Sequence, residues 1–82
     1  MDYNNIVSNI YSQMIEVDKQ GLEPYYLFLS RDVFKILEIE LLKTDLHRNG
    51  KVEFFEKMEI ISHLSVPEDH IEVRGLKLVN VR

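Results

Sequence analysis

Hydrophobic residues recur at three- and four-residue intervals near the start of the chain. The stripe consists of Ile6, Ile10, Met14 and Val17. This spacing predicts an amphipathic helix over residues 2–20 that buries the stripe in the core. Asp2 can cap the start of the helix, Gly21 can end it in a left-handed conformation, and Pro24 prevents its continuation.

An unbroken apolar run rich in aromatic residues follows at 25–29 and predicts a buried β-strand. Ser30 can cap a second helix, expected over residues 31–43. One stripe of that helix, at one-turn spacing, is expected to face inward and consists of Val33, Leu37 and Leu41. Ile36 and Ile39 lie outside this stripe. The helix therefore has more apolar surface than one face of a sheet would cover.

The most polar stretch, residues 44–51, contains the turn-forming pair Asn49-Gly50. Hydrophobic positions after it again recur at intervals of four and three. They are Phe54, Met58 and Ile61. This spacing predicts a third helix over residues 53–64. A competing interpretation makes residues 51–55 a strand of a hairpin around Asn49-Gly50.

The C-terminal part alternates apolar and charged residues from Ile71 to Arg74, is interrupted by Gly75, and resumes an extended pattern over residues 76–81. It predicts a β-hairpin or a bulged pair whose last strand is apolar on both faces. The whole chain, residues 1–82, is expected to be one α+β domain. Its elements are ordered helix, strand, helix, an optional further helix, strand and strand. About three strands form a small, mainly antiparallel sheet that packs with two to three helices.

Composition narrows the class of protein. The chain has 82 residues, of which 45% are hydrophobic and none is cysteine, so neither disulfides nor thiolate metal sites are expected. Its formal net charge of −4, with the basic residues dispersed, argues against direct binding to nucleic acid. No apolar stretch approaches the roughly 20 residues of a spanning helix, and the start lacks the pattern of a signal peptide. A cytoplasmic protein without membrane association is expected.

Residues 45–56, DLHRNGKVEFFE, resemble the calcium-binding loop of an EF-hand. The oxygen-ligand positions of that loop fall on Asp45, His47, Asn49, Glu53 and Glu56, and the sharp bend falls on Gly50. Four features depart from the family: His47 offers a nitrogen, Arg48 and Lys51 add positive charge to the loop, Lys57 follows where an apolar helix face usually begins, and the chain has one such segment where EF-hands work in pairs. The resemblance implies a weak or dimer-dependent calcium site on Asp45, Asn49, Glu53 and Glu56, and a plain surface turn around Asn49-Gly50 is the alternative.

Other candidates for chemistry have simpler explanations. His63 and His70 could bind zinc with a neighbouring acid, but their spacing matches no ligand signature and favours surface histidines. Ser30 has the position of a nucleophile elbow without its flanking glycines, so capping is favoured. An acidic helix stripe could imitate the phosphates of DNA, although a solvated face explains it equally well. The stripe consists of Glu53, Glu56 and Glu59.

Two segments, PYYLFLSRDVFKIL and IEVRGLKLVNV, together resemble small proteins encoded by tailed phages. They are similar to the strand, helix and glycine-containing strand of phage capsid accessory domains. The match covers residues 24–42 and 71–81. This resemblance implies a binding or assembly role inside an infected bacterium, and it brings no catalytic residue with it.

These observations favour a small non-enzymatic protein that binds a partner protein or forms homo-oligomers through an apolar interface, without a cofactor. The first alternative is a calcium-binding helix-loop-helix module built on the loop at 45–56. The second is an acidic DNA mimic that inhibits a nucleic-acid enzyme.

Overall fold

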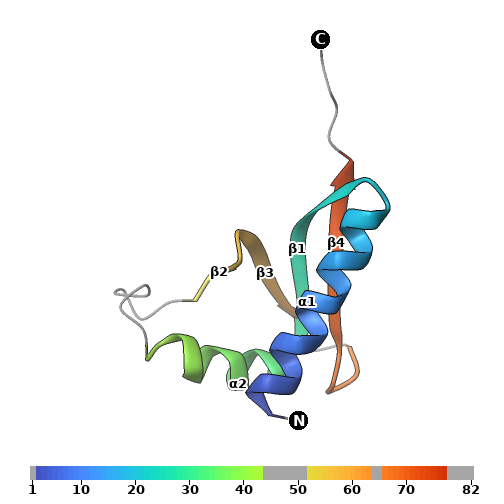
Figure 1. Ribbon diagram of the computed structural model, residues 1–82. Coiled ribbons are helices and arrows are strands. Elements are labelled where there is room, and N and C mark those ends of the chain that lie inside the picture. Colours follow the sequence, from blue (N-terminus) through green and yellow to red (C-terminus); the bar gives the residue numbers. More distant parts are fainter. Residues whose placement is uncertain (1, 44–51, 64–65, 78–82) are drawn as a thin grey trace.

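The computed structural model describes residues 2–43, 52–63 and 66–77. These residues form an α+β domain of two helices and four strands, which confirms the predicted class (Figure 1). The elements in chain order are α1 (Tyr3–Lys19), β1 (Leu22–Ser30), α2 (Arg31–Leu41), β2 (Phe54–Phe55), β3 (Met58–His63) and β4 (Ile71–Lys77). The strands form one mixed sheet in the order β2-β3-β1-β4.

Local signals in the sequence set both ends of α1 and the start of α2. The Asp2 carboxylate accepts a hydrogen bond from the Asn5 amide at 2.8 Å, as expected of an N-cap. Gly21 takes a φ of 80° just after α1, a conformation that glycine adopts without steric cost. The Ser30 hydroxyl accepts a hydrogen bond from the Val33 amide at 3.1 Å and caps α2. The predicted caps are therefore confirmed.

β1 is the central strand of the sheet. It pairs in parallel with β3 on one side and antiparallel with β4 on the other. The parallel pairing with β3 is possible because α2 returns the chain to the opposite end of the sheet. The predicted strand over residues 25–29 is confirmed, and it extends back to Leu22 through a bulge between Pro24 and Tyr26.

The helix predicted over residues 53–64 is wrong, because this segment forms the β2–β3 hairpin. Met58 is fully buried and Ile60 packs against the core, whereas Glu59 between them is exposed, so the pattern has a period of two. The turn is made by Glu56 and Lys57, with φ values of 50° and 70°. The alternative turn at Asn49-Gly50 lies outside the described residues.

The predicted break at Gly75 is also wrong. β4 continues through Gly75 as one strand and pairs with β1, so the sheet is four-stranded and mixed where about three mainly antiparallel strands were expected. Glycine is required here for close packing, since a Cβ atom at Gly75 would lie 2.4 Å from the Val17 Cγ1 atom. The last strand, expected over residues 76–81 with apolar side chains on both faces, is described only as far as Lys77.

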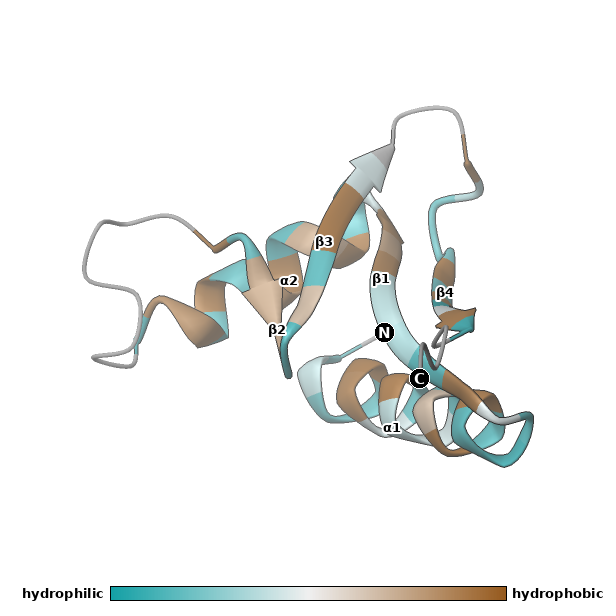
Figure 2. Cartoon of the chain, turned by 90° about the horizontal axis from the view of Figure 1, so that it is seen from above, coloured by the Kyte–Doolittle hydropathy of each residue, from teal (hydrophilic) through white to brown (hydrophobic). Residues whose placement is uncertain are grey.

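The core lies between the sheet and the helices. α1 lies along β1 and β4, and α2 packs against α1, β1 and β3. Viewed from above, α1 lies on one side of the sheet (Figure 2). The largest fully buried side chains are Ile6, Ile10, Leu27, Leu29, Leu37, Met58 and Val33.

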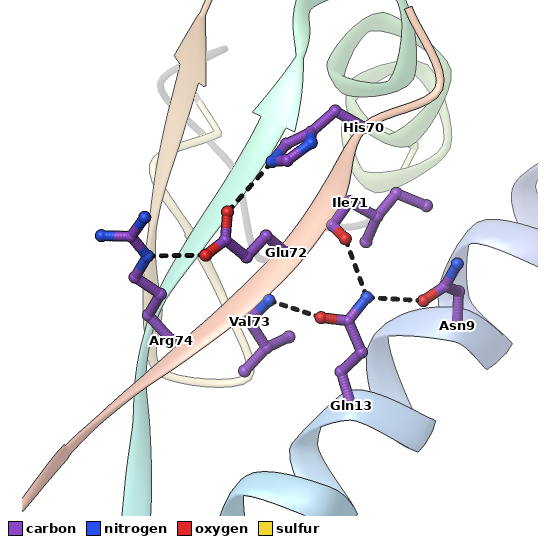
Figure 3. Close-up of polar contacts among 7 residues, drawn as sticks. All are labelled: Asn9, Gln13, His70, Ile71, Glu72, Val73 and Arg74. Atoms are coloured by element: carbon purple, nitrogen blue, oxygen red, sulfur yellow. Dashed lines mark hydrogen bonds and ion pairs between the residues drawn. The ribbon is translucent and has the colours of Figure 1, made fainter. Parts of the chain in front are cut away.

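Gln13 of α1 protects the outer edge of β4. Its side-chain amide donates a hydrogen bond to the Ile71 carbonyl and accepts one from the Val73 amide, both at 2.8 Å (Figure 3). The same Nε2 atom donates to the Asn9 carboxamide oxygen at 2.7 Å. Gln13 therefore takes the place of a neighbouring strand and blocks edge-to-edge pairing at this point.

Gln13→Leu should lower the free energy of unfolding by about 1–2 kcal/mol, because two part-buried backbone groups of β4 lose their partner. Asn9→Ala is the matched control, since it leaves both backbone hydrogen bonds in place. Urea unfolding measures the stability, and amide hydrogen exchange at Val73 should accelerate in Gln13→Leu alone. Equal losses in the two variants would contradict the role given to Gln13.

Candidate functional site

An open apolar groove of about 330 Å³ lies along α1. It is lined by Tyr11, Met14, Ile15, Asp18 and Pro24. Ile15 is 56% exposed and Tyr11 is 41% exposed. Two large hydrophobic side chains one helical turn apart therefore face water next to a hollow, a pattern typical of binding surfaces.

The sequence creates the groove because α1 has more apolar positions than the sheet can cover. The stripe around Ile10 is buried, and Tyr11 and Ile15 lie beside it on the adjacent helix face. Pro24 of β1 supplies the remaining apolar wall. Asp18 is the only charged side chain among the five lining residues.

Tyr11 connects α1, which forms one wall of the groove, to the β2–β3 hairpin through two contacts. Its hydroxyl donates a hydrogen bond to the Glu56 carboxylate at 2.7 Å, and its ring centroid lies 6.1 Å from that of Phe55. The hydrogen bond to Glu56 raises the pKa of Tyr11, with smaller contributions from burial and from the negative charge of Glu56. The phenol is therefore kept in its neutral, hydrogen-bonding form.

The Tyr11–Glu56 contact makes the free energy of unfolding depend on pH in the alkaline range. Because the pKa of Tyr11 is raised on folding, the contact contributes stability below the pKa of an unfolded tyrosine and loses it as pH rises through the folded value. In an ultraviolet titration of phenolate, Tyr11→Phe should remove one late step, and Glu56→Gln should move that step to lower pH. Tyr25→Phe is the control and should leave the step in place. An unchanged step in Glu56→Gln would contradict the assignment.

The side of the sheet turned away from α1 has a mixed aromatic and charged surface, termed here the open face. It is made by Tyr26, Phe28, Glu59, Ile61, Glu72 and Arg74. Arg74 places its guanidinium carbon 4.8 Å from the centroid of the Phe28 ring. The bulge next to Tyr26 brings Tyr25 into edge-to-face contact with it, at 4.9 Å between centroids.

Glu72 organises the charges of the open face. Its carboxylate accepts a hydrogen bond from Arg74 Nε at 2.7 Å, and its other oxygen lies 3.1 Å from His70 Nε2 (Figure 3). The hydrogen bond from Arg74 lowers the pKa of Glu72, the contact with His70 lowers it further, and burial opposes both. Stability from this network is therefore present above the pKa of an unfolded glutamate and is lost as pH falls through the folded value.

A second hollow, of about 220 Å³, lies at the start of α2. It is lined by Asp32, Val33, Ile36, Glu68 and Asp69. Its acids do not form a metal centre, since the described part of the chain has no group of three or more metal-ligating side chains placed to hold an ion. Ser30 lies close by and donates a hydrogen bond to the Glu68 carbonyl at 2.7 Å, so its hydroxyl is buried and serves the cap.

The predicted calcium ligands are only partly described. Asp45, His47 and Asn49 lie outside the described residues. The Glu53 carbonyl accepts a hydrogen bond from the Ile60 amide at 2.9 Å, and Glu56 lies in the hairpin turn. A hairpin thus stands where the loop was expected to enter a helix. The calcium site itself stays a prediction, and calcium titration calorimetry on the native chain and on Glu56→Gln would measure it.

The other sequence-based candidates are dispersed. The acidic helix stripe proposed for DNA mimicry does not form, because Glu56 lies in the turn and Glu59 lies on the open face. His70 contacts Glu72, and the side chain of His63 is outside the description. Sequence reasoning missed both the groove and the open face. The available signal was the apolar surplus of α1 at Tyr11 and Ile15.

Comparison with protein families, with curated proteins and with solved structures finds no match to this chain. Within residues 2–43, 52–63 and 66–77, no helix is long and apolar enough to cross a membrane.

Proposed function

We propose that this protein is a small non-enzymatic module that binds another protein through the apolar groove of α1. The phage resemblance of residues 24–42 and 71–81 adds a context to this proposal, which is assembly or host binding by a phage or prophage product. The absence of a recognisable catalytic motif in the sequence supports a binding role.

One observation supports the proposal most strongly: Ile15 and Tyr11 are exposed side by side at the rim of a hollow. Burying the exposed part of such side chains contributes about 1–2 kcal/mol each to an interface. Among the described residues, Ile15 belongs neither to the buried core cluster nor to the hydrophobic side chains packed against it. A binding partner that buries Ile15 would explain why a hydrophobic residue occupies this exposed position.

Asp18 indicates the chemistry of the partner. It places a carboxylate at the end of an otherwise apolar hollow. A complementary segment would insert aliphatic or aromatic side chains beside Tyr11 and Ile15, and would place a lysine or arginine next to Asp18. The net charge of −4 would also speed association with a basic partner.

The first test is a size measurement by light scattering at micromolar concentration, combined with affinity capture from bacterial cells by the tagged chain. We expect a captured protein at a defined stoichiometry. A clean monomer that captures no protein would contradict the proposed function.

A further inference from the structure

We infer that the open face is self-complementary and pairs with the same face of a second copy, about a two-fold axis that runs along β1. This surface lies on the opposite side of the sheet from α1 and is separate from the groove. The inference concerns which surface joins two copies, so it goes beyond the proposed function.

One row of side chains crosses the three strands of the open face. Tyr26 of β1 is in register with Glu59 of β3 and with Arg74 of β4. Neighbouring strands lie about 4.8 Å apart, so an acid and a base stand about 10 Å from each other with an aromatic ring between them. The residues in this row are therefore, in order across the sheet, an acid (Glu59), an aromatic residue (Tyr26) and a base (Arg74).

A two-fold rotation about the direction of β1 exchanges the two ends of this row. The Arg74 side chain of one copy then faces Glu59 of the other, and the reverse pair forms on the far side. Tyr26 meets Tyr26 of the second copy at the centre. A rotation about the row itself would place like charges together, so the charge pattern selects one orientation.

The two charged groups differ in how they are held. Arg74 is held by its Nε hydrogen bond to Glu72 and by its position over the Phe28 ring, and its side chain is 59% exposed, so its terminal guanidinium nitrogens are accessible to a further acceptor. Glu59 is exposed and makes no ion pair or side-chain hydrogen bond with any residue that the structure describes. The arrangement offers a preorganised donor and a free acceptor.

The next row is compatible with the same axis. Phe28 is in register with Ile61 on one side and with Glu72 on the other. The Arg74 guanidinium lies over the Phe28 ring of its own copy, so Phe28 takes part in the face through this stack. Glu72 needs no partner across the interface, because Arg74 and His70 already contact its carboxylate.

The size of the face sets the expected strength. Three strands about six residues long, at about 3.3 Å per residue and about 4.8 Å apart, give a footprint on the order of 300 Å² per copy. Stable interfaces bury about 800 Å² per partner. We therefore expect weak association, with a dissociation constant from about ten micromolar to about a millimolar.

Charge reversal tests this pairing directly. Glu59→Arg and Arg74→Glu should each raise the self-dissociation constant at least tenfold in analytical ultracentrifugation, because both contacts then join like charges. An equimolar mixture of the two variants should recover association as a heterodimer, since both of its contacts join opposite charges. Circular dichroism verifies that each variant is folded, and Glu59→Gln controls for loss of charge without repulsion.

Three outcomes would overturn the inference: wild-type association by Glu59→Arg, a mixture that stays monomeric, or association that is lost in Ile15→Glu and kept in Glu59→Arg. The last outcome would assign the contact to the groove and leave the proposed function standing. If Arg74→Glu does not fold, Glu59→Arg decides alone, with loss of association supporting the pairing and unchanged association refuting it.

Discussion

Leu27→Ala should lower the free energy of unfolding by about 3–4 kcal/mol, measured by urea denaturation. Leu27 is fully buried at the centre of β1, in register with Ile60 on one side and with Val73 on the other. Its loss leaves a cavity that neither neighbouring strand can fill without shifting. Since a domain of this size has a total stability of about 5 kcal/mol, the variant should be largely unfolded at modest denaturant concentrations.

Leu76→Ala is the matched control for Leu27. The residue type is the same, but Leu76 is 43% exposed on the edge strand β4, so the loss should stay below about 1 kcal/mol. Similar losses at the two positions would show that β1 is not the central strand of the sheet.

Gly75→Ala should cost about 2–3 kcal/mol, for a reason unrelated to backbone flexibility. A Cβ atom at Gly75 would lie 2.4 Å from the Val17 Cγ1 atom and 2.8 Å from the Leu22 Cβ atom. Neither atom can swing away, because Cβ is fixed to the backbone and valine is stiff about χ1. α1 must therefore move away from β4, which also weakens the contact made by Gln13.

Gly21→Ala separates steric conflict from conformational strain. No atom lies within 4 Å of the site where its Cβ would be, so only the φ of 80° opposes the substitution, at a cost of about 1 kcal/mol. Thermal and urea unfolding of both variants give the comparison. A Gly75→Ala chain as stable as Gly21→Ala would contradict the close approach of α1 to β4.

The first half of the fold could be predicted because its signals are local. Asp2, Gly21 and Ser30 lie at the ends of helices and act through contacts a few residues away. The run of β1 is short and rich in aromatic residues, and Pro24 precedes it, which together favour a buried strand over a helix. These elements follow from the sequence without knowledge of the rest of the chain.

The second half depends on contacts that sequence spacing does not reveal. Met58 and Ile61 are spaced as on a helix, yet the segment pairs with β1 because α2 brings it there. Gly75 was expected to interrupt the strand. Glycine is needed there because α1, from a distant part of the chain, packs closely against that position. Long-range pairing overrode local spacing at both positions.

The groove and the open face could not be predicted either, because both depend on contacts between distant parts of the chain. Tyr11 and Ile15 are hydrophobic positions whose exposure depends on how α1 is rotated over the sheet. The opposite charges of Glu59 and Arg74 come into one row only through the register of three strands. Neither surface could be assembled from sequence separation alone.

The groove is tested most directly by comparing Ile15→Glu with Ile39→Glu. Both residues are isoleucines on helices, with exposed fractions of 56% and 59%, so neither substitution should unfold the chain. The measurement is the dissociation constant for the protein captured by the native chain. The account predicts at least a tenfold loss for Ile15→Glu and less than a twofold change for Ile39→Glu, and equal effects of the two substitutions would contradict it.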